Sequence, residues 1–293
     1  MPLVRYIVRR IIFVVPQLFG IVLVSFFLVK LIPGDPAVMM LGPTASAQSL
    51  AELRDKMGFT KPLLEQLTHY LADVARGDLG TSWQTTRPVT EDLFQRFPAT
   101  LELVTFGLLL AIVIGFPLGV AAARLKRGAT RKVADYYGLL AGALPDFWLA
   151  LVLIYLFYTV LGWIPAPLGR IDMAVLPPPT VTGSLVIDSL FAGDWEALKS
   201  SLGHLALPVL TLGLINAGPI LKMTQSMTER TLSSDFVRYA ELCGLPRRVV
   251  LRQAVRAALP SVVTIISVLY GLFMIVWCGL VGTTIWGGFN EAR

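Results

Sequence analysis

Charged residues are scarce in this sequence. Asp, Glu, Lys and Arg make up 15% of the 293 residues, whereas soluble globular chains carry about a quarter. Apolar residues make up 55%, which excludes an intrinsically disordered chain and argues against an ordinary cytosolic enzyme. Lys and Arg exceed Asp and Glu by 25 to 19, so the net charge is +6. In so apolar a chain, this excess first raises the question of which side of a membrane the basic residues occupy.

Cysteine and histidine are rarer still. Cys243 lies among charged residues and Cys278 in an apolar run, so they predict neither a disulfide framework nor a zinc site. His69 and His204 have no acidic or thiol neighbour at ligand spacing, and we expect both at the surface or at an interface. No Gly-x-Ser-x-Gly, Walker-type phosphate loop or Gly-x-Gly-x-x-Gly occurs. The chain is therefore predicted to be no enzyme and to carry no cofactor or metal of its own.

Long apolar runs are abundant instead. A bilayer core about 30 Å thick needs roughly 20 apolar residues of helix. Five stretches meet this need: residues 11–29, 103–123, about 136–163, 205–221 and 262–281. The first exceeds the apolar run of a signal peptide, and no small-x-small cleavage site follows it, so we expect it to be retained. The sequence predicts an all-α integral membrane protein with five visible transmembrane helices.

Charge alternates between the segments that these spans separate. The N-terminus, residues 124–135 and residues 222–256 together carry 15 basic and 4 acidic residues, whereas 31–98 and 163–203 carry 8 basic and 12 acidic ones. Because cytoplasmic segments near span ends are enriched in Lys and Arg, the N-terminus is predicted to be cytoplasmic. Membrane orientation thus accounts for the net charge, and no nucleic-acid partner is needed.

Three of the spans contain features that an anchor would not need, and in the fifth these are the small residues Gly271, Gly279 and Gly282. Pro145 and Asp146 interrupt the third, and the fourth contains Pro208, Asn216 and Pro219. Proline frees backbone carbonyls that lipid cannot satisfy, so these helices are expected to face protein or water there. Asp146 and Asn216 are our candidates for a transport pathway. Asp146 can equally be a hydrated residue at a helix break, because an intramembrane carboxylate is costly.

Two further features lie outside the bilayer. Glu102 is expected in the first turn of the second span, where the helix dipole favours a carboxylate by roughly 0.3–1 kcal/mol. In residues 62–75, apolar residues recur at three- and four-residue steps, which predicts an amphipathic helix. This helix can lie on the membrane or cover the mouth of the bundle.

The cytoplasmic segment 222–259 is the longest inside loop. Ser233 or Ser234 can cap a helix over 235–243, which Gly244 and the following Leu-Pro can end. A second helix is predicted over 247–259, with Arg248, Arg252 and Arg256 in a stripe at four-residue spacing. Phe236, Tyr239 and Ala240 are expected on one face of the first helix. Such a helix can dock in a groove of a soluble partner, or pack on its own bundle while the arginines meet anionic lipid.

Several ordered motifs resemble one family. They are Ile32-Pro33-Gly34-Asp35-Pro36, Gly77-Asp78-Leu79-Gly80-Thr81-Ser82, Arg87-Pro88-Val89, Pro98-Ala99-Thr100-Leu101-Glu102-Leu103, Phe147-Trp148-Leu149-Ala150 and Leu161-Gly162-Trp163-Ile164-Pro165-Ala166. Together they resemble the dipeptide, oligopeptide and nickel permeases, which are membrane subunits of bacterial ATP-binding cassette importers. The resemblance runs from about Arg5 to about Thr264.

This resemblance implies a function and a set of partners. The chain would be the transmembrane subunit of an ATP-driven importer for short peptides or a related small solute, in the bacterial inner membrane. It would work with a second homologous permease, one or two cytosolic ATP-binding subunits that hold ATP and Mg, an extracytoplasmic substrate-binding protein and membrane lipid. The run from Arg238 to Gly244 resembles the family's coupling motif, with Ala240 and Gly244 kept. The residues expected to couple to the ATPase are Asp235, Phe236, Arg238, Tyr239, Ala240, Glu241, Gly244 and Arg248.

The resemblance also bears on domain organisation. We expect residues 1–30 to form the N-terminus and first span, 31–98 an extracytoplasmic segment with amphipathic helices, and 99–293 the permease core with its coupling loop 222–259. The family usually has six spans, whereas here no sixth apolar run follows residue 281. The absent span leaves open a non-transporting assembly subunit, and the carboxylate of Asp146 leaves open an ion-coupled secondary transporter.

Overall fold

The computed structural model describes residues 2–31, 36–42, 44–56, 58–82, 87–125 and 128–284. The regular elements within these ranges are helices, and one isolated β-bridge pairs Thr81 with Pro88. The motif residues 32–35 and the tail 285–293 lie outside the described residues. The chain forms two compact units, residues 1–94 and 95–293.

The first unit begins with a long apolar helix and continues with three shorter ones. They are α1 (Pro2–Leu31), α2 (Pro36–Leu41), α3 (Ala47–Lys56) and α4 (Leu63–Ala75). Helix α4 confirms the predicted amphipathic helix, and its Tyr70 ring lies 5.6 Å from the Phe26 ring of α1. After α4, Gly77 adopts φ +84° while the Asp78 N–H donates to the Asp73 carbonyl at 2.9 Å. This is the glycine-dependent bonding pattern that ends a helix sharply.

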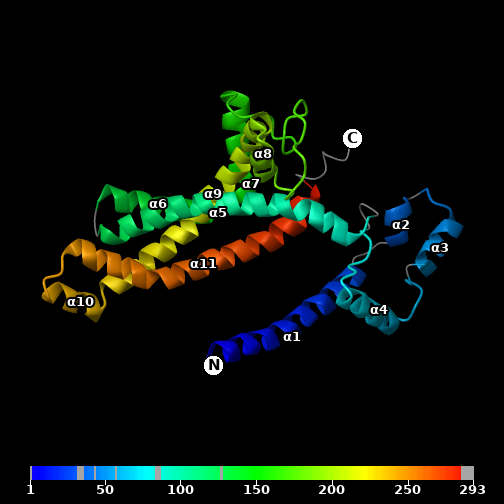
Figure 1. Ribbon diagram of the computed structural model, residues 1–293, viewed down its shortest axis with the longest axis horizontal. Coiled ribbons are helices and arrows are strands. Elements are labelled where there is room, and N and C mark those ends of the chain that lie inside the picture. The colour runs from blue at the N-terminus through cyan, green and yellow to red at the C-terminus, as the bar shows by residue number, and fades with distance from the viewer. Residues whose placement is uncertain are drawn as a thin grey trace. The chain divides into compact units, whose positions relative to one another are not determined.

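The second unit contains the remaining helices (Figure 1). They are α5 (Val89–Arg124, which starts within the first unit), α6 (Ala129–Ala143), α7 (Asp146–Ile154) with the π-helical turn η1 (Tyr155–Val160), α8 (Leu185–Ala192), α9 (Trp195–Leu232), α10 (Asp235–Leu242) and α11 (Arg247–Thr284). Within the described residues, four helices are long and apolar enough to cross a membrane, and α6 with α7 and η1 makes a bent fifth candidate. The five predicted spans agree with this set.

The third span is bent by 104° between α6 and α7. Pro145 causes this bend, because proline disfavours the helical conformation of the residue before it. Leu144 is extended, with φ −82° and ψ +129°, and Pro145 then serves as the residue preceding α7. The predicted interruption at Pro145 is therefore confirmed. In contrast, Pro208 and Pro219 do not break α9, which runs through both.

Helix α9 is the centre of the second unit. In its most apolar stretch 61% of the residues are buried, compared with 11% in α11. Small residues let α5 approach it closely: a Cβ at Gly115 would lie 2.6 Å from the Ala217 carbonyl oxygen. A Cβ at Gly119 would lie 2.7 Å from the Leu221 carbonyl oxygen. The buried core is thus built around α9, while outward faces of the other spans stay apolar and suited to lipid.

Helix α11 corrects a prediction. The separate helix expected over 247–259 and the fifth span are one continuous helix that includes Pro260. The buried residues of α11 explain why, because they recur every four residues on both sides of the proline: Val250, Ala254, Ala258 and Val262. One face of a single helix buries all four, which outweighs the backbone hydrogen bond lost at Pro260.

Candidate functional site

Helix α10 lies at the tip of a helical hairpin made by α9 and α11. Its inner face buries Val237 and Ala240 against Val250 of α11. Its other apolar side chains point outward, with Phe236 47% and Tyr239 71% exposed. The expectation that Ala240 shares a face with these two aromatics is therefore wrong, because Ala240 is only 7% exposed. The helix is held to its own bundle by one face and presents two aromatic rings on another.

Both ends of α10 have defined geometry. Gly244 has φ +76°, and the Leu245 N–H donates to the Ala240 carbonyl at 3.2 Å, so the predicted helix end at Gly244 is confirmed. At the other end, Ser234 occupies the capping position, but its hydroxyl donates to the Thr231 carbonyl instead of accepting from α10. The predicted serine cap is therefore not formed. The first-turn carboxylate of Asp235 still complements the helix dipole.

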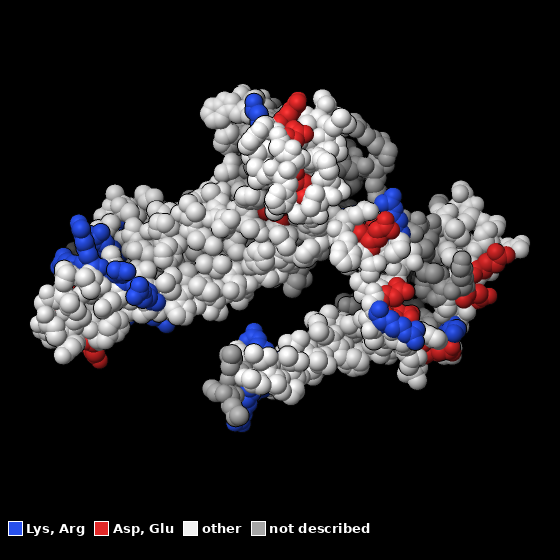
Figure 2. Space-filling model, viewed as in Figure 1, with Lys and Arg blue, Asp and Glu red and all other residues white. Residues whose placement is uncertain are grey.

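Basic side chains surround α10. The exposed ones are Arg238, Arg247, Arg248, Arg252 and Arg256, and Figure 2 shows Lys and Arg gathered over the end of the second unit that carries α10. Arg248 stands in the first turn of α11, and Glu241 is also exposed. We call this end the cytoplasmic end, following the orientation that the charges predict.

An ion-pair network joins α6 to α9 just before α10. Lys222 Nζ lies 2.8 Å from Asp135 Oδ1, and Arg131 Nη1 lies 3.0 Å from Glu229 Oε1. The Gln225 amide also donates to Asp135 Oδ1, at 3.2 Å. Sequence reasoning missed this network, because its members are 87 to 98 residues apart in the chain and only the fold brings them together.

Buried polar groups on the same stretch of α9 have no partner among the described residues. They are Thr224 Oγ1, Gln225 Oε1 and Thr228 Oγ1. Buried polar atoms are nearly always hydrogen-bonded, so each such group calls for an explanation.

The two pathway candidates occupy different environments. Asn216 is 5% exposed, and its amide donates to the Leu212 carbonyl of its own helix at 2.8 Å. Asp146 is exposed as the first residue of α7, next to the bend. Among the described residues, no hydrogen bond or ion pair joins the two. Their role in a pathway stays a prediction.

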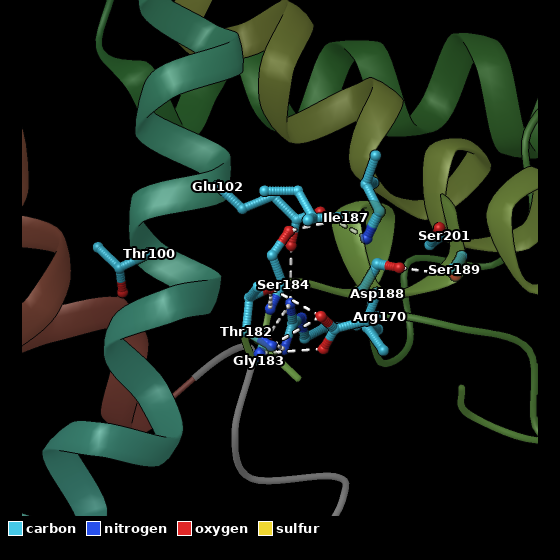
Figure 3. Close-up of polar contacts among 12 residues, drawn as sticks. Thr100, Glu102, Arg170, Thr182, Gly183, Ser184, Ile187, Asp188, Ser189 and Ser201 are labelled. Atoms are coloured by element: carbon cyan, nitrogen blue, oxygen red, sulfur yellow. Dashed lines mark hydrogen bonds and ion pairs between the residues drawn. The ribbon is translucent and has the colours of Figure 1, made fainter. Parts of the chain in front are cut away.

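A buried polar cluster lies at the opposite end of the second unit (Figure 3). Glu102 projects from α5, and its Oε2 accepts a hydrogen bond from Arg170 Nη2 at 2.7 Å. Its Oε1 accepts the Val186 N–H, in the first turn of α8, at 2.9 Å. Because α5 begins at Val89, Glu102 lies in the helix interior and not in a first turn as predicted. The only feature of the sequence that pointed to this cluster was a carboxylate at the edge of an apolar run.

His204 also departs from expectation. It is buried, at 6% exposed, on α9, whereas His69 is largely exposed on α4 as predicted. The His204 Nδ1 pairs with the Ser200 carbonyl at 2.9 Å, and Nε2 lies 3.6 Å from Asp172. The spacing of residues in the sequence could not predict that His204 lies beside Asp172, because Asp172 comes from a loop 32 residues earlier in the chain.

Comparisons with known proteins identify the family. Residues 115–289 match the model described as the inner membrane component of binding-protein-dependent transport systems. Residues 3–104 match the model of the N-terminal part of such membrane components. The first match covers more than half of the chain, and the two together cover residues 3–289 apart from 105–114.

Curated relatives agree with this assignment. The chain is 35% identical over 270 residues to the dipeptide transport system permease protein DppB of Alkalihalophilus pseudofirmus, a match that covers 92% of this chain and 80% of that protein. It is 38% identical over 253 residues to the probable D,D-dipeptide transport system permease protein DdpB of Escherichia coli, covering 86% and 74%. It is 30% identical over 273 residues to the glutathione transport system permease protein GsiC of Salmonella typhi, covering 93% and 79%.

These findings confirm the resemblance drawn from the motifs and the multi-pass, all-α inner membrane fold. The family is one of transport permeases and not of catalytic enzymes. The chain therefore belongs to the family of binding-protein-dependent transport system inner membrane components, as the transmembrane permease subunit of an ATP-binding cassette importer.

Proposed function

We propose that the chain forms part of the translocation pathway for dipeptides or other short peptides. The support comes from its relatives, whose names assign them to dipeptide, D,D-dipeptide and glutathione transport. Glutathione is itself a tripeptide, so the shared chemistry of these solutes is a short peptide with charged ends.

We infer that α10 is the contact with a cytosolic ATP-binding subunit. The observation that carries this inference is the division of α10 into two faces: Val237 and Ala240 are buried against α11, while Phe236 and Tyr239 are exposed. Aromatic rings are frequent anchors of protein interfaces. Asp235, Arg238, Glu241 and Arg248 surround these rings with charge that can set the orientation of a partner. Gly244 fixes where the helix ends.

The hairpin gives α10 a mechanical connection to the bundle. Helix α10 joins α9 and α11, which are each 38 residues long and pack against one another. The Lys222–Asp135 and Arg131–Glu229 pairs extend this connection to α6. A displacement of α10 by a partner that hydrolyses ATP would therefore reach three of the spans. In this proposal ATP and Mg belong to one or two partner ATPase subunits, and the chain itself does no chemistry.

Further partners belong to the same proposal. A second homologous permease would complete the pathway, and an extracytoplasmic binding protein would deliver the substrate. Membrane lipid would cover the exposed apolar faces of the spans. Asp146 and Asn216 remain candidates for residues along the pathway.

The coupling proposal is tested by the double substitution Phe236→Ala and Tyr239→Ala. Both rings are exposed, so their removal leaves the Val237–Ala240–Val250 cluster in place. We expect co-purification of the ATPase subunit to fall by about 10-fold or more, which corresponds to the loss of one interface hot spot, and uptake to fall with it. Phe94→Ala, which removes a still more exposed ring (82%) from α5, is the control and should co-purify normally. Normal co-purification and uptake in the double variant would overturn the proposal.

Substrate class needs a separate measurement. Proteoliposomes with the complete importer are given a labelled dipeptide, glutathione or a nickel chelate. Saturable, ATP-dependent uptake of the peptides is expected. Uptake of the nickel chelate alone would show that the peptide assignment is wrong while leaving the importer assignment intact.

A further inference from the structure

The segment between η1 and α8 has no helix or strand among its residues 161–184, yet three sets of contacts hold it, and two of these are hydrogen bonds or ion pairs to the bundle. We call residues 161–192, which include α8, the cap. The acidic balance of 163–203 places the cap on the extracytoplasmic side. The family depends on a binding protein that acts from that side. The contacts that attach the cap therefore determine which parts of the core can respond to that protein.

The first tie is the Glu102–Arg170 ion pair. The two side chains are 5% and 15% exposed, so the pair is largely removed from water. Glu102 also accepts the Val186 N–H, one of the first N–H groups of α8, which lack partners within their own helix. Arg170 reaches on to the Gly183 carbonyl, at 3.4 Å and 3.5 Å. A single carboxylate of α5 thus holds both the loop and the start of α8.

The second tie shapes the turn that enters α8. The Asp188 carboxylate accepts the N–H groups of Val181, Thr182 and Gly183 and the Thr182 hydroxyl, at 2.7–3.2 Å. Gly183 has φ +80°, and a Cβ there would lie 2.9 Å from Pro98 of α5. Pro98 and Glu102 are one helical turn apart on α5, so both lie against the turn that precedes α8.

The third tie joins the loop to α9. The Asp172 N–H donates to Ser200 Oγ at 2.9 Å, and the Ser200 hydroxyl donates to Asp172 Oδ2 at 3.0 Å. His204, one turn further along α9, lies beside the same carboxylate. The loop is therefore fixed to two spans that are far apart in the sequence.

The cap also presents apolar side chains outward. Met173, Leu176 and Val181 are each more than 70% exposed, on a segment that lies outside the candidate spans. A rigid loop with such side chains is suited to meet a protein, and its attachments determine which helices respond to that contact.

We propose that Glu102 and Arg170 are positioning residues that make the cap move together with α5, so that contact of the binding protein with the cap is transmitted to the core. This inference rests on the importer function described above. Without the pair, α5 and the cap lose their direct charged link, and contact at the cap is transmitted less effectively to α5.

Arg170→Gln in the complete importer, reconstituted in lipid, tests this. It leaves Glu102 bonded to Val186 but removes the ionic link. We expect stimulation of the ATPase by the substrate-loaded binding protein to fall by about 5-fold or more, the usual lower range of allosteric coupling. ATPase activity without binding protein should stay at the wild-type level, and Arg170→Lys should recover part of the stimulation. Glu65→Gln, which breaks an exposed ion pair with Lys61, is the control and should behave as wild type.

A second measurement does not depend on transport. Hydrogen exchange of the loop amides at Thr182 and Gly183 and of the Val186 amide should speed up severalfold in Arg170→Gln. The double variant Glu102→Gln with Arg170→Gln removes both buried charges and should show the same loss of stimulation in a well-folded complex.

Three outcomes would overturn the inference. Unchanged stimulation in both variants would show that the pair does not transmit contact. Equal loss of basal and stimulated ATPase would show a merely structural role. Unchanged exchange at 182–186 would show that the pair does not hold the cap. A wild-type importer without uptake or stimulation would instead contradict the proposed function, and the exchange result would still decide whether the pair holds the cap.

Discussion

Lys222 of α9 lies with its ammonium group 2.8 Å from Asp135 of α6, and its aliphatic chain crosses Gly138 to reach it. A Cβ at Gly138 would lie 2.5 Å from Lys222 Cε, so a larger residue there would make the flexible lysine side chain shift. The two side chains are each 39% exposed. The pair therefore links two spans close to α10 while remaining accessible to water.

The Lys222–Asp135 pair should matter more for transport than for stability. Half-exposed ion pairs contribute about 0–1 kcal/mol, so Lys222→Met should change the melting temperature little while reducing ATP-dependent uptake by about 5-fold or more. Lys199→Met changes an exposed lysine at the other end of α9 and should leave uptake intact. Normal uptake in Lys222→Met would contradict a role of the pair in transmission.

Close packing of α5 on α9 predicts a strong effect of one methyl group. Gly119→Ala places a Cβ 2.7 Å from both the Leu221 carbonyl oxygen and Thr224 Cβ, so it should destabilise the bundle by about 1–3 kcal/mol. Gly142→Ala on α6 meets nothing within 4 Å and should be neutral or stabilising by up to about 1 kcal/mol. Thermal unfolding of both variants in detergent measures the contrast. Equal melting temperatures would show that the helices are not so closely packed.

The Asp188 carboxylate predicts a pH dependence. Burial by itself raises its pKa, whereas the hydrogen bonds from Thr182, Gly183 and Val181 together hold that pKa below its usual value. A carboxyl with a lowered folded-state pKa contributes stability that is present above its unfolded pKa of about 3.9, and loses it as the pH falls through the folded value. Asp188→Asn should therefore be less stable than the wild type at pH 7, by about 1–3 kcal/mol.

Melting temperatures measured from pH 7 to pH 3 test this. The gap between wild type and Asp188→Asn should narrow only below about pH 4. A gap that stays constant down to pH 3, or one that is absent at pH 7, would contradict the role assigned to the carboxylate.

Asp146 separates ATP-driven transport from ion-coupled transport. It is exposed in the first turn of α7, where a helix dipole favours a carboxylate by about 0.3–1 kcal/mol. In an ATP-driven importer, uptake by Asp146→Asn should still depend on ATP and not on an ion gradient, because the carboxylate then serves no ion coupling. Uptake driven by an ion gradient in the wild type, and abolished by Asp146→Asn, would instead favour the ion-coupled alternative.

Several features could be predicted because they depend on residues close together in the chain. Pro145 breaks the third span because it acts on the residue directly before it. Gly244 ends α10 because only glycine adopts φ +76° without strain. The amphipathic helix α4 followed from spacing along a single turn of helix. In each case the deciding interaction lies within a few residues.

Other predictions failed because tertiary packing decided which face of a helix is buried. Phe236, Tyr239 and Ala240 share a helical face by spacing, but burial against Val250 turned Ala240 inward. The helix expected over 247–259 and the span expected over 262–281 form one helix, because the four-residue repeat of buried side chains keeps α11 continuous through Pro260. Local propensity favoured a break, and packing on α9 outweighed it.

The sequence by itself determined the apolar spans, their alternating charge and the breaks at particular prolines and glycines, because hydropathy and backbone conformation are properties of short segments. Only the tertiary structure decided that Glu102 meets Arg170, 68 residues later, and that Lys222 meets Asp135, 87 residues earlier. Charges in an apolar protein must find partners to leave water, and which partners they find depends on how whole helices pack.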